Sequence, residues 1–236
     1  MTIENGTRIN EWFVPKFGPT RFRVVVGLLF LPYTGMCISF AVIGSLAAGN
    51  ISWDRVGAIA LIYALALGVS AHAADTVGSK AKKPWGNYFS KRQLLVLAAV
   101  SLAGAYAIGV YYIIFFVPLL APIALLEGFF LFAYNFEILG GRFHNDFWFA
   151  VSWGSLPVLA GYAIQTNTID VLVVGISIAT GLVSFLEIRL SRPYKELRRS
   201  GLDENRATKL EGGLKILSVG TIAVAAFLTT LKIIFS

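Results

Sequence analysis

The chain has 236 residues, of which 56% are hydrophobic and only 14% are charged. A soluble domain carries about 25% charged residues, so this composition excludes an ordinary soluble protein and requires a surface that faces lipid. The formal net charge of +7 is typical of basic loops that hold membrane topology and contact anionic headgroups. The sequence therefore predicts an integral, multi-pass protein of the cell membrane, with membrane lipid and no nucleic acid among its partners.

Apolar runs bounded by charged residues predict the membrane spans, each of which needs roughly 20 apolar residues. The longest run holds roughly 40 residues and is divided by a tight turn near Phe116, Val117 and Pro118, because one helix of that length is twice what a bilayer requires. The predicted fold class is all-α: a polytopic transmembrane helical bundle of about seven spans. Residues 1–23 form an N-terminal segment, and residues 24–236 form a single transmembrane domain. The spans are Val24–Leu46, Val56–Ala74, Leu94–Phe116, Pro118–Tyr134, Phe147–Gln165, Ile169–Leu186 and Leu214–Phe235.

Lysine and arginine placement predicts the orientation of these spans, because cytoplasmic loops carry an excess of both residues. Of the twenty basic residues, eighteen lie before span one or in the loops after spans two, four and six. Only Arg55 and Lys232 lie on the other side. The bias alternates with every span, which favours seven spans with a cytoplasmic N-terminus over six or eight.

Scarce polar groups mark the cytoplasmic ends of the spans, and ionisable groups at membrane depth are functional candidates. His72 and Asp75 are three residues apart near the end of span two, so they share one helical face. Glu187 closes span six on the same side, where a site role and a headgroup role are equally favoured. For His72 with Asp75, the sequence favours a site.

Two further polar features have structural alternatives. In His144-Asn145-Asp146, the Asn or Asp before an apolar run is what a helix N-cap requires, so a cap and a site role are equally favoured. Glu127 lies near the centre of span four, where a charge is costly, and a structural hydrogen bond is its favoured role. Small residues in span five, such as Gly154 and Gly161, predict close helix packing.

This arrangement resembles the UbiA superfamily of intramembrane prenyltransferases. In that family, helices surround a lipid-open cavity, and aspartate-rich motifs lie in cytoplasmic loops after spans two and six. Here the large polar loops also follow spans two and six. The first contains Ala71-His72-Ala73-Ala74-Asp75 and then Lys83-Pro84-Trp85, where the family has Asn-Asp-x-x-Asp-x-x-x-Asp followed by Arg-Pro. Only Asp75 falls on a motif aspartate, while Ala71, His72 and Ser79 occupy the other motif positions. The stretch Trp153–Gly161 looks like the fifth helix of the family.

The resemblance implies transfer of a prenyl chain from a prenyl diphosphate to a hydrophobic, lipid-soluble acceptor. It implies Asp75 and His72 as catalytic residues, and Asp75 and Glu187 as ligands of Mg²⁺, although a metal-free site is the alternative. Because the cytoplasmic face is more basic than acidic, direct contacts to the diphosphate would replace part of the metal's role. The residues expected to make these contacts are Lys80, Lys83, Arg189, Arg192 and Lys195. Aromatic faces would stabilise the developing carbocation.

Two alternatives remain open at this point. The first is a non-catalytic lipid-binding or assembly subunit of a membrane complex, which the incomplete motif set favours. The second is a metal-dependent membrane oxidoreductase, because imidazole and carboxylate together suit iron or zinc better than magnesium. Two histidines are few for such a site. Its candidate ligands are His72, Asp75, Glu137, His144 and Asp146.

Overall fold

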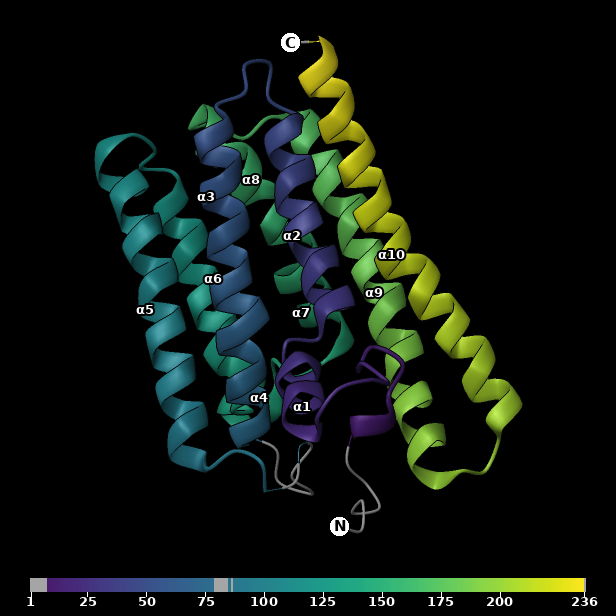
Figure 1. The fold of residues 1–236 in the computed structure, drawn as a ribbon. Helices are drawn as coiled ribbons and strands as arrows, with labels where there is room; N and C mark the ends of the chain where they lie inside the picture. The colour runs from purple at the N-terminus through teal and green to yellow at the C-terminus, as the bar shows by residue number, and fades with distance from the viewer. Residues whose placement is uncertain (1–7, 79–84, 86, 236) are drawn as a thin grey trace.

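The computed structural model describes residues 8–78, 85 and 87–235, and every regular element in these ranges is helical. Six helical segments are long and apolar enough to cross a membrane, as Figure 1 shows. They are Thr20–Leu46 (α1, Thr20–Leu28, and α2, Leu31–Leu46), Trp53–Gly78 (α3, Trp53–Tyr63, η2, Ala64–Ala71, and α4, His72–Gly78), Lys91–Phe115 (α5), Asp146–Thr166 (α7, Asp146–Ala150, η4, Val151–Ser155, and α8, Leu156–Thr166), Val171–Ser200 (α9) and Glu204–Phe235 (α10). The predicted all-α membrane bundle is confirmed at this level.

The predicted fourth span is a shorter helix, α6 (Leu120–Asn135), of 16 residues or about 24 Å. The turn expected near Pro118 is present, because α5 ends at Phe115 and α6 begins at Leu120. The Leu119 amide donates to Asn167 Oδ1 at one end of the bundle, at 3.0 Å, while Asn135 lies at the other end. The helix α6 therefore joins both ends of the bundle although it is shorter than its neighbours.

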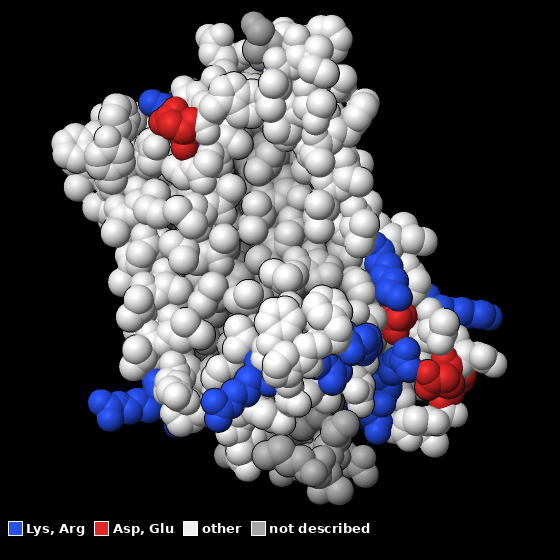
Figure 2. All heavy atoms as spheres, in the orientation of Figure 1, with Lys and Arg blue, Asp and Glu red and all other residues white. Residues whose placement is uncertain are grey.

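Basic residues gather at one end of the molecule, as Figure 2 shows. We call this the basic end; it holds the N-terminal residues from Arg8, the end of α4 at Gly78 and the turn between α9 and α10 (Figure 1). There α9 continues to Ser200, well past the predicted Leu186, and α10 begins at Glu204, before the predicted Leu214. These charged extensions are helical, which a count of apolar residues does not reveal.

The N-terminal segment packs onto the basic end of the bundle. Ile9, Phe13 and Val14 are buried in a cluster with Trp85 and Tyr194. Backbone carbonyls of the segment accept hydrogen bonds from Arg23 and Lys16, with Arg23 Nε 2.7 Å from the Pro15 oxygen. Burial and the nearby Arg23 guanidinium lower the pKa of Lys16. The predicted terminal segment is thus continuous with the membrane domain from Arg8 onward.

A break at Phe30 divides the first membrane segment into α1 and α2. Phe30 adopts φ 45° and ψ 47°, the left-handed region that a residue with a bulky side chain rarely adopts. Thr34 Oγ1 donates to the Leu29 carbonyl at 2.7 Å, which satisfies an acceptor freed by the break. The break places the Phe30 ring in parallel contact with the His72 ring, 4.5 Å between centroids.

Two of the membrane segments contain π-helical turns, η2 (Ala64–Ala71) before His72 and η4 (Val151–Ser155) before Pro157. A proline ring collides with the carbonyl four residues earlier in an α-helix, and the wider π turn at Trp153 relieves this for Pro157. Single π turns inside α-helices often lie at functional sites. His72 directly follows η2 and Trp153 lies within η4, and the centroids of their two rings are 5.3 Å apart.

Glycines set the contact between α2 and α8 at the centre of the bundle. A side chain at Gly44 or Gly161 would collide with the backbone of Val158 or Ala41, so neither position has room for even a methyl group. Ser45 Oγ donates to the Gly161 carbonyl at 2.8 Å across this contact. The small residues predicted to pack span five are therefore confirmed as packing residues.

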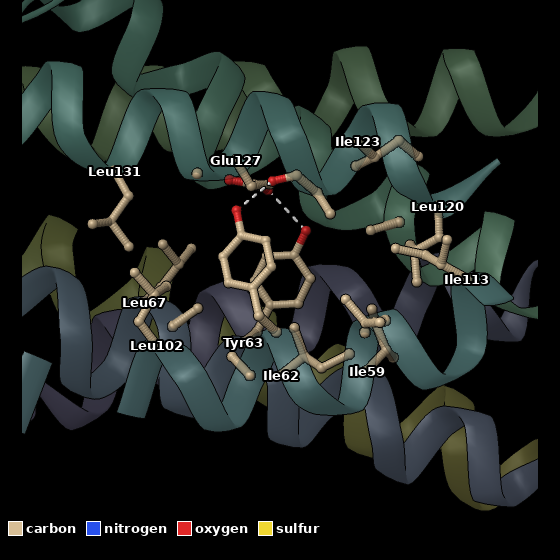
Figure 3. Close-up of a pocket in the computed structure, with 18 residues that line it drawn as sticks. Ile59, Ile62, Tyr63, Leu67, Leu102, Ile113, Leu120, Ile123, Glu127 and Leu131 are labelled. Carbon is tan, nitrogen blue, oxygen red and sulfur yellow. Dashed lines mark hydrogen bonds between the residues drawn. The ribbon is translucent and has the colours of Figure 1, made fainter. Parts of the chain in front are cut away.

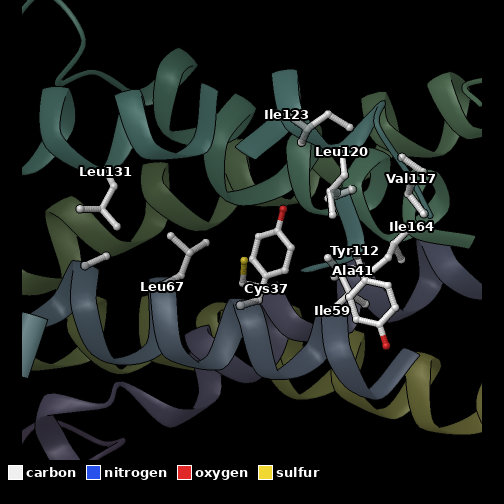
Figure 4. Packing of buried hydrophobic residues seen from close by; sticks show 14 residues of the cluster. Cys37, Ala41, Ile59, Leu67, Tyr112, Val117, Leu120, Ile123, Leu131 and Ile164 are labelled. Atoms are coloured by element: carbon white, nitrogen blue, oxygen red, sulfur yellow. The ribbon is translucent and has the colours of Figure 1, made fainter. Parts of the chain in front are cut away.

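The main apolar core lies between α2, α3, α5, α6 and α8. Figure 4 shows its side chains, among them Cys37, Ile59, Leu67, Ile123 and Ile164. All five are at least nine-tenths buried. The helix α10 lies outside this core against α2 and α9, and Figure 1 shows it along one edge of the bundle.

Candidate functional site

A cavity of about 220 Å³ opens at the basic end, where the ends of α4, α6 and α9 meet the N-terminal segment. Its wall carries three basic side chains, two acidic ones and several aromatic rings. The charged, aromatic and amide side chains of the wall are Arg8, Phe30, Tyr33, His72, Asp75, Tyr134, Asn135, His144, Phe149, Trp153, Glu187, Arg192 and Lys195. The ends of the second and sixth predicted spans thus converge on one cavity.

His72 lies on the floor of this cavity and is 9% exposed. Its Nε2 is 3.3 Å from Thr34 Oγ1, and the donor role depends on the ring tautomer. The Thr34 hydroxyl already donates to the Leu29 carbonyl, so it accepts from the ring and Nε2 carries the proton. The Phe30 and Trp153 rings flank the imidazole. The imidazole is therefore held in one orientation by a hydrogen bond and two aromatic contacts.

Asp75 lies one helical turn beyond His72 on the same face of α4, as the sequence predicts. Its Oδ2 is 3.9 Å from Arg8 Nη1, and the Asp75 side chain is 40% exposed. At this exposure the ion pair contributes about 0–1 kcal/mol. Arg8 also lies over the face of the Phe30 ring, 5.2 Å from its centroid. The Asp75 carboxylate consequently remains accessible to a ligand in the cavity.

The basic side chains of α9 have two different environments. Lys195 and Arg192 line the cavity, and Arg192 Nη1 also contacts Asp146 Oδ1 at 3.1 Å. Arg189 is absent from the cavity wall; its Nη1 is 3.6 Å from Asp146 Oδ2 and its side chain is 65% exposed. Asp146 therefore pairs with both arginines, of which Arg192 alone lines the cavity.

Glu187 is the most buried acidic residue of the cavity, at 4% exposure. Its Oε2 is buried and has no hydrogen-bond partner among the described residues. Together with Asp75 it gives the cavity two carboxylates, and no group of three or more potential metal ligands exists in the described part of the chain. Protein-bound Mg²⁺ often uses one or two carboxylates together with substrate phosphates and water. The described part of the cavity wall therefore offers two carboxylates as candidate metal ligands, one of them with an unpartnered oxygen.

The structure brings together five of the predicted site residues, His72, Asp75, Glu187, Arg192 and Lys195. Arg189 lies outside the cavity wall, and Lys80 and Lys83 lie outside the described residues. Sequence reasoning missed Arg8, Phe30 and Tyr33 as wall residues. In the sequence Arg8 is one of the eighteen basic residues that indicate orientation, and the backbone break at Phe30 has no local sequence pattern.

Three of the five residues predicted as candidate ligands of a transition metal line the cavity. His72, Asp75 and His144 line the cavity, whereas Glu137 and Asp146 are absent from its wall. His144 Nδ1 is 2.9 Å from the Tyr134 carbonyl oxygen, and its ring stacks on the Tyr134 ring at 4.3 Å. Asn145 Oδ1 accepts from the Trp148 amide at 3.1 Å, which makes Asn145 the N-cap of α7. The cap interpretation of this segment is confirmed for Asn145.

A second cavity lies deeper in the bundle, between α3, η2, α5 and α6, with α8 behind it. It measures about 60 Å³ and is lined almost entirely by apolar side chains (Figure 3). The polar atoms of the wall belong to Glu127, Tyr63 and Tyr106, and Tyr63 Oη donates to Glu127 Oε1 at 2.8 Å. The structural hydrogen bond expected for Glu127 is thus present.

The two cavities share the helices η2 and α6 but differ in polarity. Comparison of the chain with protein-family models, with curated proteins and with solved structures finds no match. What the chain binds must therefore be inferred from the side chains that line these cavities.

Proposed function

We propose that this chain is an intramembrane prenyltransferase, similar to the UbiA superfamily, that moves a prenyl chain from its diphosphate to a lipid-soluble acceptor. The observation that carries the proposal is the basic-end cavity, which combines cationic and aromatic side chains where the chain leaves the apolar bundle. An amphiphile with an anionic head and an apolar chain matches that combination. We also infer that α6 crosses with the six longer segments, giving seven spans of the cell membrane with the basic end in the cytoplasm.

The cationic side chains would bind the diphosphate. Arg8, Arg192 and Lys195 reach the cavity from the N-terminal segment and from α9, so a phosphate between these elements meets them from two directions. Arginine offers paired donors to phosphate oxygens, and Arg192 is already oriented by Asp146. Lys80 and Lys83 are proposed to add to this set.

Asp75 and Glu187 would hold Mg²⁺ jointly with the diphosphate. The ion would supply positive charge beside the leaving oxygen. The unpartnered Oε2 of Glu187 supports this role, because a buried carboxylate oxygen without a partner costs about 1–3 kcal/mol. Asp75 remains reachable, since its pairing with Arg8 is loose.

In the proposed reaction the bond between the prenyl C1 carbon and the diphosphate oxygen breaks, and both bonding electrons leave with the diphosphate. The nucleophilic atom of the acceptor forms a bond to C1 and loses its proton to His72. Positive charge that develops on the prenyl chain would lie beside aromatic faces, which attract cations. The rings of Phe30 and Trp153 flank His72, Phe149 stacks on Trp153, and all three line the cavity.

The test is transfer of radiolabel from farnesyl or geranylgeranyl diphosphate into lipid-extractable product by membranes that contain the full chain. We expect Asp75→Asn to reduce transfer at least tenfold. Asp203→Asn is the matched control, because Asp203 is exposed at the basic end outside the cavity and Asn preserves its cap on the Arg206 amide. Full transfer by Asp75→Asn would remove Asp75 from the mechanism.

A second candidate is a lipid-binding or assembly subunit without catalysis. The observation that favours it is the shortage of metal ligands, since the described residues hold no group of three or more. The helix α10 exposes most of its apolar surface, since only 11% of its most apolar 18-residue stretch is buried, and this surface would be available to a partner subunit. Saturable binding of a prenyl diphosphate without turnover, and a co-purifying partner, would favour this candidate over transfer.

A further inference from the structure

The carboxyl group of Glu127 has one satisfied oxygen and one unsatisfied oxygen. Tyr63 donates to Oε1, whereas Oε2 is buried with no hydrogen-bond partner among the described residues. The Tyr106 hydroxyl lies nearby but donates to the Ala124 carbonyl at 2.9 Å. Figure 3 shows Tyr63 pointing across the cavity toward Glu127, with labelled aliphatic side chains on both sides. The cavity therefore retains the capacity for one further hydrogen bond at Oε2.

The missing partner is best supplied by a hydroxyl group. A hydroxyl both donates and accepts, so it pairs with Oε2 whether Glu127 carries a proton or not. A charged group is excluded by the remaining wall, which is built from residues such as Ile62, Leu102 and Ile123. The wall equally requires that the atoms next to the hydroxyl be carbon.

The size of the cavity indicates how much of such a molecule it holds. One water needs about 10–15 Å³ on this measure of volume, so about 60 Å³ accommodates a hydroxyl and a few neighbouring carbons. Val110 belongs to the wall and is 43% exposed on the outer surface of α5. The remainder of the molecule would thus extend past α5 into lipid. A water molecule alone would leave most of this cavity empty, since the cavity volume is several times what one water needs.

Two glycines, Gly109 and Gly128, shape this space. A side chain at Gly128 would meet the Tyr106 hydroxyl, so glycine lets Tyr106 cross the helix interface and close one side. A Cβ at Gly109 would have only Ile62 near it, at 4.0 Å, which shows that the space in front of Gly109 is free. Gly109 thus offers a position from which the cavity can be filled without touching Glu127.

We propose that this cavity binds the hydroxyl end of a neutral, membrane-soluble alcohol or phenol, with Glu127 Oε2 as its hydrogen-bond partner. The proposal goes beyond the prenyl transfer proposed above and does not depend on it, because none of the charged residues of the basic-end cavity contributes to this wall. The ligand class follows from one unsatisfied polar atom, Glu127 Oε2, in a mostly apolar space that reaches the lipid-facing side of α5.

The experiment uses the full chain in lipid nanodiscs and two photoreactive probes, a dodecanol with a diazirine on its third carbon and the methyl ether of the same compound. Mass spectrometry locates the labelled peptides. The ether lacks the donor, and one hydrogen bond contributes about 0.5–1.5 kcal/mol. We therefore expect the alcohol to label α5 and α6 about threefold to tenfold more than the ether. Equal labelling by the two probes would overturn the proposal.

Two substitutions separate the hydrogen bond from the space. Glu127→Leu should abolish the preference for alcohol over ether. Gly109→Leu should abolish labelling by both probes although Glu127 is unchanged, and Gly109→Ala should reduce it partly if the leucine variant does not fold. Gly175→Leu in α9 is the matched control, because nothing lies within 4 Å of its Cβ position. Undiminished labelling in a folded Gly109 variant would contradict the proposed place of binding.

Competition distinguishes the two sources of a hydroxyl. Farnesol represents isoprenoid alcohols and 4-nonylphenol represents phenolic lipids, and the one that displaces the dodecanol probe at lower concentration identifies the class. Displacement by neither would count against the proposal. Asp75→Asn should leave labelling unchanged, because Asp75 is absent from this wall. Labelling of the unmodified chain without any prenyl transfer would support this site while disproving the proposed reaction.

Discussion

The basic-end cavity and the Glu127 cavity differ in the number and the surroundings of their charged side chains. At the basic end, five charged side chains from the N-terminal segment, α4 and α9 line an open space, and the ion pair between Arg8 and Asp75 is loose and partly exposed. Around Glu127, one carboxyl group lies among aliphatic side chains with a single tyrosine hydroxyl bound to it. The difference shows that several charged groups gather where the chain leaves the apolar bundle, while within the bundle a single carboxyl group is held by one hydrogen bond.

The largest expected effect is on diphosphate binding at the basic-end cavity. Lys195→Met should weaken the binding of farnesyl diphosphate about tenfold to a hundredfold, because a hydrogen bond to a charged group contributes about 1.5–3 kcal/mol. Equilibrium binding of a fluorescent farnesyl diphosphate analogue measures this. Lys209→Met is the control, since Lys209 is exposed on α10 at the same end and is absent from the cavity wall. Equal weakening by both variants would mean that general charge, rather than the cavity, attracts the ligand.

The second effect is on stability at the Glu127 cavity. Tyr63→Phe removes the donor to Oε1 and leaves the carboxyl without a protein partner, which should lower the free energy of unfolding by about 1–3 kcal/mol. Thermal unfolding in detergent measures the change. Tyr106→Phe should cost less, because its acceptor is a backbone carbonyl of α6 that a helical amide can also satisfy. A larger loss for Tyr106→Phe would show that Glu127 tolerates isolation.

A third, smaller effect concerns the helix that brings Trp153 to the basic-end cavity. Asn145→Ala should destabilise the fold by about 1 kcal/mol, since Asn145 caps α7 through the Trp148 amide. Asn145→Asp preserves the cap and should be close to neutral. Denaturant or thermal unfolding of the three proteins tests the difference, and indistinguishable stabilities would rule out the cap as a stabilising contact.

The smallest effect is expected for Arg189. Arg189→Gln should change stability by less than about 1 kcal/mol, because its ion pair with Asp146 is exposed and Asp146 keeps Arg192. In the farnesyl diphosphate assay it should change affinity far less than Lys195→Met does. An equally large loss of affinity would restore the direct phosphate contact that the sequence predicts for Arg189.

The sequence predicted the order of the helices well, because the length of an apolar run is a local property. The length of the apolar run predicted the division at Pro118. The shared face of His72 and Asp75 was predicted from helical spacing, which is also a local property. The helix ends were predicted less well. The extension of α9 to Ser200 is charged and helical, so it leaves no mark in a hydropathy count.

The remaining site features depend on tertiary structure. Arg8 reaches the cavity only because the N-terminal segment folds back against α4 and α9. Phe30 faces His72 only because the backbone turns left-handed at that residue, at a cost of about 1–3 kcal/mol that neighbouring contacts must offset. Neither event has a sequence pattern of its own, whereas Glu187 and Lys195 could be predicted from their place at a span end.

The π-helical segment η2 ends immediately before His72, so it separates the direction of the site residues from that of the helix before it. A residue removed from a regular α-helix rotates all that follows by about 100°. A π turn holds about one residue more than an α turn, so η2 can lose one residue by becoming α-helical while His72 and Asp75 keep their direction. The placement of these two residues would therefore tolerate a one-residue deletion between Ala64 and Ala71, a change that in an uninterrupted α-helix would turn them off the cavity wall.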